Sequence, residues 1–271
     1  MRLIPPAYVK PFVKRQKNDM ADAEAICEAA QRPTMRFVAV KSEAKKASAV
    51  VFRTRDLLVM HRTQIINALR GHMGEFGFIA PQGAGNVDRL VTAIDDPSST
   101  VPEAARTCLL RLVEMLRGLQ TQIAALDAEI AGRAKRDDAS RRLMTIPGIG
   151  PLIATALEAL APPAETFGSG RDFAAWLGLT PLQKSSGGKQ RMGRTSRMGE
   201  RTLRRLLIIA CSAVVRWAKR KGATSNAWLT GMLSRKPAML VIVALANKTA
   251  RIAWAVMTRG EVYKAPIAAA A

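Results

Sequence analysis

A polar run, residues 183–199, constrains this chain more than any other feature, because apolar helical segments precede and follow it. The run holds almost no apolar side chain, so it cannot build a hydrophobic core and must lie in solvent or on a ligand. Its basic residues are spread among glycines, which suits a backbone that moulds to phosphate groups. A charge run can also be an ordinary solvated face, but we interpret this one as a nucleic-acid contact. The predicted contact residues are Lys184, Lys189, Arg191, Arg194 and Arg197, together with Arg201 just beyond the run.

The charge of the chain favours a polyanionic partner. Lys and Arg number 42 against 21 Asp and Glu, which gives a formal charge of +21 and an isoelectric point near 11.0. A field of this sign attracts nucleic acids. Residues 1–132 carry +4 and residues 133–271 carry +17, so the binding face is expected mainly in the second half.

The cysteines, histidines and apolar segments are typical of a cytoplasmic protein without a zinc site. Cys27, Cys108 and Cys211 lie far apart in apolar helical contexts, which predicts reduced thiols in the core. Two histidines give no zinc-type spacing. The start has no apolar signal region, and polar residues interrupt the apolar stretch 238–256, which favours a buried helix over a membrane span.

The sequence Ile-Pro-Gly-Ile-Gly at residues 146–150 predicts a tight turn between two helices, with Pro151 at the first helical position. Gly148 and Gly150 permit a close backbone approach, and the free amides that begin the next helix form an anion site. A helix-hairpin-helix grips a phosphodiester in this way without reading bases. The alternative, that the glycines only join two packed helices, is about as well supported by the glycines alone.

Two helices are expected to flank the polar run. A short one lies within residues 167–181, and a longer one begins at Arg201. We expect buried side chains at Phe173, Trp176, Leu177, Leu203, Leu206, Leu207 and Ala210, and exposed ones at Arg201, Arg204 and Arg205.

An acidic pair, Asp19 and Asp22, lies in a helix expected from about residue 18 to residue 30, with Asn18 or Asp19 near its cap. A spacing of three places both carboxylates on one helix face. Clustered acids of this kind hold divalent metal ions in nucleases and recombinases. For an arbitrary pair, the more usual explanation is that acids in a first turn favour the helix dipole.

Leucine and isoleucine recur at alternating intervals of three and four over residues 109–130, the clearest heptad in the chain. The repeat predicts a coiled coil of about three heptads. Its partner is either the long helix expected over residues 42–72 of the same chain or a second copy of the chain. The repeat consists of Leu109, Leu112, Leu116, Leu119, Ile123, Leu126 and Ile130.

The residues around the polar run resemble the C-terminal domain of the insertion-sequence 110 family of transposases, in particular its 1111 subgroup. The matching string begins at residue 167 as Phe-x-Ser-x-Arg-Asp-Phe-Ala-Ala-Trp-Leu-Gly-Leu-Thr-Pro. It continues from residue 185 as Ser-Ser-Gly-Gly-Lys-x-Arg-x-Gly-Arg and from residue 196 as Ser-x-Met-Gly-x-Arg-x-Leu-Arg-Arg-Leu-Leu. Lys-Asn-Asp-Met-Ala-Asp-Ala from residue 17 matches a second family motif, so the resemblance covers essentially the whole chain.

The resemblance implies a transposase with two catalytic elements. In the family, four acids of a RuvC-like domain hold Mg²⁺; Asp19 and Asp22 match the last two, and nothing upstream matches the first two. The chain is therefore expected to be N-terminally truncated, with an incomplete metal site. The family also uses a serine nucleophile, for which Ser185 is the best match and Ser186 the second choice. Its implied partners are DNA, a guide (bridge) RNA and another copy of the chain, paired through the coiled coil, at the bacterial nucleoid.

The fold class expected from these features is mainly α. We expect a remnant of a RuvC-like α/β domain with the following long helix over residues 1–72, and a loop and coiled coil over 73–135. An all-α C-terminal transposase domain with a helix-hairpin-helix follows over 136–262, then a frayed tail over 263–271. Strands are expected near residues 3–4 and 36–40. The predicted function is DNA strand cleavage and joining during insertion-sequence transposition. The alternative is a truncated, non-catalytic DNA- or RNA-binding protein that mixes with full-length transposase.

Overall fold

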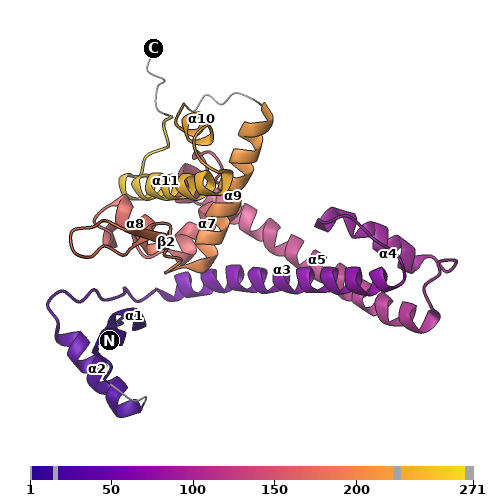
Figure 1. The fold of residues 1–271 in the computed structure, drawn as a ribbon, viewed down its shortest axis with the longest axis horizontal. Helices are drawn as coiled ribbons and strands as arrows, with labels where there is room; N and C mark the ends of the chain where they lie inside the picture. The colour runs from indigo at the N-terminus through magenta and orange to yellow at the C-terminus, as the bar shows by residue number, and fades with distance from the viewer. Residues whose placement is uncertain (1, 15–17, 222–226, 266–271) are drawn as a thin grey trace. The chain divides into compact units, whose positions relative to one another are not determined.

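The structure, a computed structural model, describes residues 2–14, 18–221 and 227–265. The chain is mainly helical and divides into two compact units, residues 1–46 and 47–271 (Figure 1). Lys17 of the Lys-Asn-Asp motif lies outside the described residues, as do residues 266–271 of the predicted tail.

The first unit contains α1 (Pro6–Val9), η1 (Lys10–Phe12) and α2 (Asp19–Gln31). Helix α2 begins where the sequence predicts because Asn18 caps it: its Oδ1 accepts the N–H of Ala21 at 2.7 Å. The two expected strands are reduced to one antiparallel bridge, between Leu3 and Val38. Residues 5 and 6 are both proline and have no N–H to continue a ladder.

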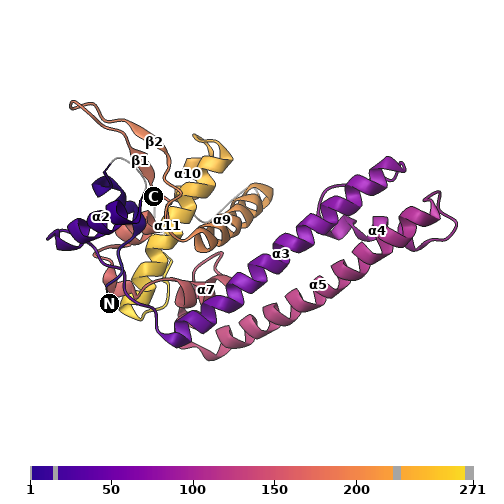
Figure 2. The ribbon, with the colours of Figure 1, turned by 90° about the horizontal axis from the view of Figure 1, so that it is seen from below.

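Two long helices run side by side: α3 (Glu43–Glu75), of which all but the first turn belongs to the second unit, and α5 (Glu103–Arg136) (Figures 1 and 2). Between them in sequence come η2 (Ala84–Asn86) and α4 (Asp88–Asp95). Arg55 of α3 donates two hydrogen bonds to the carboxylate of Asp127 on α5. Nε donates to Oδ1 at 2.5 Å, and Nη2 donates to Oδ2 at 3.2 Å. The three helices share an apolar core that contains Ile65, Ile66, Leu69, Met73, Leu90, Ile94, Leu109, Val113 and Leu116.

The heptad side chains of α5 pack against other helices of the same chain. Leu109, Leu116, Ile123 and Ile130, which are seven residues apart, are buried, whereas the alternate heptad positions are half-buried. Of the two partners considered for this repeat, the α3 helix of the same chain therefore packs against it. Pairing between chains stays a prediction.

A second and larger core joins the rest of the unit. Phe173, Leu177, Leu203 and Leu207 are fully buried and Leu206 is buried, as predicted, whereas Trp176 and Ala210 are half-buried. Phe167, Phe173 and Trp176 form an aromatic cluster with ring centroids 5.2–5.8 Å apart. The helices of this core are α6 (Asp138–Leu143), α7 (Pro151–Leu160), α8 (Gly170–Trp176), α9 (Arg201–Lys221), α10 (Ala227–Leu233) and α11 (Ala238–Arg259), with the 3-10 turn η3 (Ala164–Thr166).

Helix α11 lies at the centre of this core. By length and composition alone it could cross a membrane. In this fold it buries Val241, Ala246, Ala250 and Ala253 completely and packs on α8 and α9, so residues 238–256 form a core helix as predicted (Figure 1). Its accessible side carries Lys248 and Arg251 together with the apolar side chains of Met239 and Leu240.

The cysteine prediction is correct for one residue of three. Cys211 is buried, with its Sγ 3.7 Å from Oγ1 of Thr249, and burial raises the pKa of its thiol to about 11. Cys27 and Cys108 are exposed free thiols. Both lie on amphipathic helices, beside the buried stripe instead of within it.

Candidate nucleic-acid interface

The polar run forms a β-hairpin. Strands β1 (Pro181–Gln183) and β2 (Met192–Thr195) pair antiparallel, with Pro181 opposite Thr195 and Gln183 opposite Met192. The expectation of an all-α C-terminal domain is therefore wrong. The strands are too short and polar to show an apolar alternation in the sequence, so no periodic signal predicted them. The hairpin projects from the helices of its unit (Figure 2).

The hairpin is exposed throughout residues 181–192, and its tip consists of residues 184–191 between the strands. The N–H of Lys184 donates to Arg191 O at 2.8 Å, and an isolated bridge joins Ser186 to Lys189. Gly187 and Gly188 between them have φ of 54° and 74°, which a left-handed turn requires. The prediction that this segment builds no core is confirmed.

Ser185 lies at the base of this tip with its hydroxyl accessible. Its Oγ accepts the backbone N–H of Arg191 at 3.2 Å and the side-chain N–H of Gln183 at 3.4 Å. The Ser186 backbone carbonyl accepts the N–H of Lys189 at 3.1 Å. The hairpin backbone therefore orients the hydroxyl of Ser185, the serine that the sequence favours.

A backbone strap anchors the hairpin to α8. Gly178 and Gly199 both have positive φ, and a Cβ would lie 2.2 Å from Met198 O at Gly178 and 1.7 Å from Trp176 O at Gly199. Only glycine can occupy either position without moving the backbone. The strap consists of residues 196–199, and its first two N–H groups donate to Thr180 O at 2.8 Å and Gly178 O at 3.2 Å.

The arginines of α9 divide between solvent and structure. Arg201 is exposed, as predicted. Arg204 and Arg205 are half-buried, against prediction, because each has a partner from another element. Arg204 donates to Leu177 O at 3.0 Å and Met198 O at 2.6 Å, and its burial lowers the pKa of the guanidinium. Arg205 forms an ion pair with Asp56 of α3.

The predicted contact residues, which lie on the hairpin, the strap and the start of α9, keep their charge available. In the described part of the chain, no carboxylate forms an ion pair with the predicted contact residues. All of them are exposed. Because unpaired exposed cations attract phosphate at little desolvation cost, the hairpin is suited to a polyanion. These residues are Lys184, Lys189, Arg191, Arg194, Arg197 and Arg201.

The glycine turn joins α6 to α7, as predicted. Gly148 has φ of 87°, and a Cβ there would lie 2.9 Å from Cγ2 of Val214 on α9. Close packing on α9 therefore accounts for a glycine at this position. Gly150 is the N-cap of α7 and Pro151 its first residue. A phosphate contact at this turn stays a prediction.

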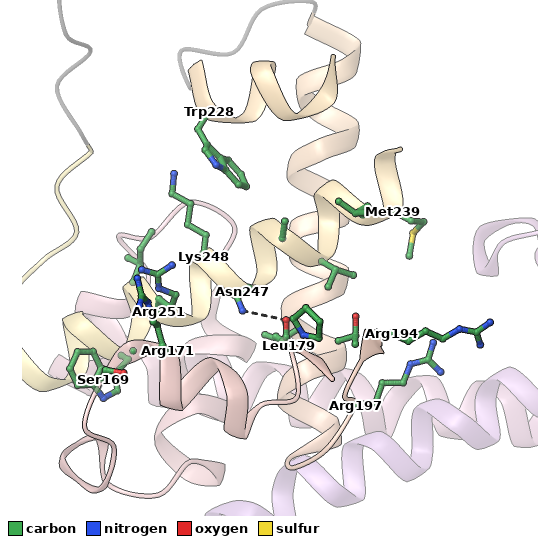
Figure 3. Close-up of a pocket in the computed structure, with 18 of the residues that line it drawn as sticks. Ser169, Arg171, Leu179, Arg194, Arg197, Trp228, Met239, Asn247, Lys248 and Arg251 are labelled. Atoms are coloured by element: carbon green, nitrogen blue, oxygen red, sulfur yellow. Dashed lines mark hydrogen bonds between the residues drawn. The ribbon is translucent and has the colours of Figure 1, made fainter. Parts of the chain in front are cut away.

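A cavity of 1370 Å³ lies between α8, the hairpin, α10 and α11 (Figure 3). Sequence reasoning selected Arg194 and Arg197 but missed three further cations in its lining, Arg171, Lys248 and Arg251. They come from elements far apart in sequence. Lys248 and Arg251 could have been selected from the sequence, because they interrupt an otherwise apolar helix.

The acidic pair occupies the first turn of α2, in the first unit. Asp19 is exposed and Asp22 half-buried. Within the described residues there is no group of three or more His, Cys, Asp or Glu side chains that could hold a metal ion. Mg²⁺ is commonly held by one or two carboxylates together with waters and phosphate oxygens, so Asp19 and Asp22 could supply part of such a ligand set, and the Mg²⁺ site stays a prediction.

The exposed cationic hairpin and the basic cavity of this mainly helical chain are complementary in charge to a polyanion. Residues 140–225 match the Transposase IS116/IS110/IS902 family. The chain is 45% identical to a probable family 20 transposase of Pseudomonas aeruginosa, over 97% of this chain and 79% of that protein. It is 38% identical to the transposase for insertion sequence element IS1328 of Yersinia enterocolitica, over 97% and 78%. It is 36% identical to the transposase for insertion sequence element IS1111A of Coxiella burnetii, over 97% and 72%. The chain belongs to the IS116/IS110/IS902 family of insertion-sequence transposases.

Proposed function

We propose that this chain cleaves and joins DNA strands, with Ser185 as the nucleophile. The observation that carries the proposal is the hairpin tip, which holds the Ser185 hydroxyl in solvent beside cations that form no ion pair with any described carboxylate. Membership of a transposase family supports the same reaction.

The chemistry is an exchange of phosphodiester bonds. Ser185 Oγ attacks a backbone phosphorus, an Oγ–P bond forms, and the bond from phosphorus to one deoxyribose oxygen breaks. The proton of the hydroxyl ends on that leaving oxygen. Attack by the hydroxyl of a second strand then forms the new DNA linkage and releases the serine, so neither step consumes water.

The surrounding residues supply the assistance that a serine needs. A serine hydroxyl is a weak nucleophile until its proton is taken or the developing charge is stabilised. Lys184, Lys189 and Arg191 flank Ser185 and would stabilise the negative charge of the pentacoordinate phosphorus. The backbone N–H of Arg191, 3.2 Å from Oγ, fixes the orientation of the hydroxyl. The α6–α7 turn at Gly148 and Gly150 would add a second contact to the DNA backbone.

The test uses the 271-residue chain and a supercoiled plasmid that carries the DNA flanking its gene. Mg²⁺ and RNA transcribed from that DNA are added, since the family resemblance implies both. We expect a covalent protein–DNA adduct that maps to Ser185 by mass spectrometry. Ser185→Ala should abolish the adduct, and Ser186→Ala, the matched control, should retain it. An undiminished adduct in Ser185→Ala would reject the nucleophile assignment.

A second candidate function is nucleic-acid binding without cleavage, in mixed assemblies with a longer transposase of the family. The observation that favours it is the acidic pair of α2, which has no third metal ligand among the described residues. A salt-dependent gel shift with no Mg²⁺-dependent cleavage by this chain would support binding alone. Cleavage by the chain itself would exclude it.

A further inference from the structure

We propose that the cavity between α8, the hairpin, α10 and α11 binds an unpaired nucleotide, with the base stacked on Trp228. The proposal rests on the proposed function insofar as both require a nucleic-acid ligand. It adds a single-stranded subsite that is separate from the serine tip, because residues 184–191 do not line the cavity.

The aromatic and apolar walls of the cavity suit a base. Trp228 of α10 is half-buried and faces the cavity from one side (Figure 3). Leu240, Val243 and Ile252 of α11 add apolar side chains to the lining. Aromatic rings that stack bases are the recurring element of single-strand binding sites, because every base has a flat face. A tryptophan in a lining with apolar side chains therefore offers a base the contact that it loses on leaving a duplex.

The charges of the cavity suit phosphate. Its charged lining residues are all basic: Arg171, Arg194, Arg197, Lys248 and Arg251. Arg171, Lys248 and Arg251 gather on the side below Trp228, and Arg194 and Arg197 lie across the cavity (Figure 3). A nucleotide on the tryptophan would thus have cations on both flanks for its own phosphate and the next one. The volume of 1370 Å³ exceeds the roughly 300–1,000 Å³ of small-molecule pockets, which favours a stretch of polymer over a free metabolite.

Lys248 links the two kinds of contact. Its Nζ lies 4.5 Å from the centre of the Trp228 ring, a cation–π pair that holds the indole over the cavity. Stacking of a base on an aromatic ring is stronger than a cation–π pair at an accessible site. A base can therefore replace the ammonium on the ring, and the flexible lysine can turn to the phosphate. Asn247, which donates Nδ2 to Leu179 O at 3.3 Å, holds α11 to the segment that leads into the hairpin.

The experiment measures binding of the full chain to fluorescent oligonucleotides by anisotropy at fixed salt. The probes are twelve-nucleotide dT and rU strands, a dT strand with abasic sites, and a duplex. We expect Trp228→Ala to weaken single-strand binding by about tenfold or more and duplex binding by less than about twofold. Trp228→Phe should retain most of the affinity. Trp217→Ala is the matched control, since Trp217 is an exposed tryptophan of α9 outside the cavity.

The abasic probe tests the same claim on the unaltered protein. Wild-type chain should bind the abasic strand about tenfold more weakly than the intact one, whether or not the variants fold. The tighter of dT and rU identifies the strand that the cavity serves. Equal binding of intact and abasic strands, or equal loss of single-strand and duplex binding in Trp228→Ala, would overturn the proposal. Failure of the proposed function instead appears as a missing Ser185 adduct with this discrimination intact.

Discussion

The hydroxyl of Thr202, in the first turn of α9, donates a hydrogen bond to Oδ2 of Asp56 on α3 over 3.0 Å. Oδ1 of the same carboxylate pairs with Arg205. Asp56 therefore ties the long helical pair to the element that follows the hairpin strap, and its side chain is only 19% exposed. Substitution by Ala should lower the free energy of unfolding by about 1–3 kcal/mol, because partly buried charge-assisted bonds are lost.

Urea denaturation of Asp56→Ala measures this effect. The control is Glu129→Ala, which breaks the exposed Glu129–Arg133 pair of α5 and should change stability by about 0.5 kcal/mol or less. Equal effects of the two substitutions would show that the Asp56 contacts do not stabilise the fold.

Gly188 and Gly199 have the same φ of 74° but different surroundings, so substituting each by Ala distinguishes the cost of backbone strain from that of a steric clash. At Gly188 nothing lies within 4 Å of an added Cβ, whereas at Gly199 the Cβ would meet Trp176 O at 1.7 Å. Gly188→Ala should cost about 1–2 kcal/mol, the cost of a left-handed conformation. Gly199→Ala should cost at least about 3 kcal/mol, since it must displace backbone. Similar melting temperatures for the two variants would contradict the strap described here.

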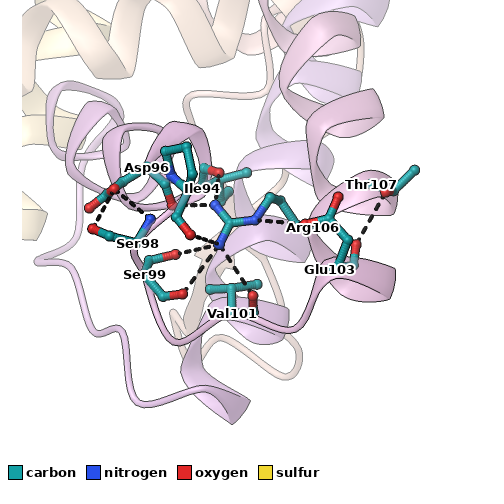
Figure 4. A network of polar contacts seen from close by, with 9 residues as sticks. Ile94, Asp96, Ser98, Ser99, Val101, Glu103, Arg106 and Thr107 are labelled. Carbon is teal, nitrogen blue, oxygen red and sulfur yellow. Dashed lines mark hydrogen bonds and ion pairs between the residues drawn. The ribbon is translucent and has the colours of Figure 1, made fainter.

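Arg106 stabilises the junction of α4 and α5. It is 8% exposed and its guanidinium binds the carbonyls of Ile94 and Asp96, the Ser99 hydroxyl and the Val101 carbonyl (Figure 4). These carbonyls include the C-terminal end of α4, where a positive charge is favourable. Arg106→Leu should destabilise the chain by about 2–4 kcal/mol and speed hydrogen exchange in α4, because buried acceptors lose their donor.

The matched control for Arg106 is Arg117→Leu, on the same helix. Arg117 pairs with Asp95 of α4 at 3.0 Å, but its side chain is 61% exposed. Its loss should change stability by about 0.5 kcal/mol or less. Comparable hydrogen exchange in the two variants would argue against a buried network at Arg106.

The thiols should differ sharply in reactivity. Cys27 and Cys108 are exposed and should react with a thiol reagent at pH 8 in the folded protein, whereas Cys211 should react only on unfolding. Burial raises the pKa of Cys211 from an ordinary 9.0 to about 11, so the folded state holds the proton more tightly than the unfolded state. Its contribution, on the order of 2–3 kcal/mol, is present below pH 9 and is lost as the pH rises toward 11.

Thiol titration and urea denaturation from pH 8 to 10.5 measure both effects. Cys211→Ala is the control, and its stability should decline less steeply with rising pH over this range. Two fast-reacting thiols are expected in the native chain, and a third in denaturant.

The hairpin cations should govern the salt dependence of DNA binding. Each lost phosphate contact lowers the slope of log K against log salt by about 0.9, so Lys189→Gln with Arg191→Gln should reduce it by roughly 1.8. Arg259→Gln, an exposed change in the last turn of α11, is the control for net charge. An unchanged slope in the double variant would place the DNA elsewhere.

Features that depend on local sequence were predictable. Asn18 predicts the start of α2, and Gly148 and Pro151 predict the turn into α7. The heptad of α5 predicts which of its side chains are buried. Capping, turn formation and periodicity each depend on only a few neighbouring residues. The heptad alone could not identify its partner. Chain-internal packing on α3 depends on how the segment between the two helices folds.

Features that depend on distant contacts were not predictable. Asp56 lies 146 residues from Thr202, and nothing local indicates that they meet. The hairpin strands are held by the contact between Gly178 and the strap at residues 196–199, and they carry no apolar alternation. The cavity draws Arg171, Trp228 and Arg251 from three helices, so only the fold assembles it. The exposed loop around Ser185, by contrast, was predictable because it is one contiguous motif, and the role of Ser185 as nucleophile stays a prediction.

The exposure of the hairpin tip means that its sequence can change with little effect on the fold. No residue from 184 to 191 belongs to either apolar core, so substitutions of its residues other than Gly187 and Gly188 should leave thermal stability almost unchanged. Copies with inactivated tips would accumulate as well-folded proteins, invisible to any screen for stability. For the same reason, new loop sequences can be introduced between residues 184 and 191 without redesign of the scaffold.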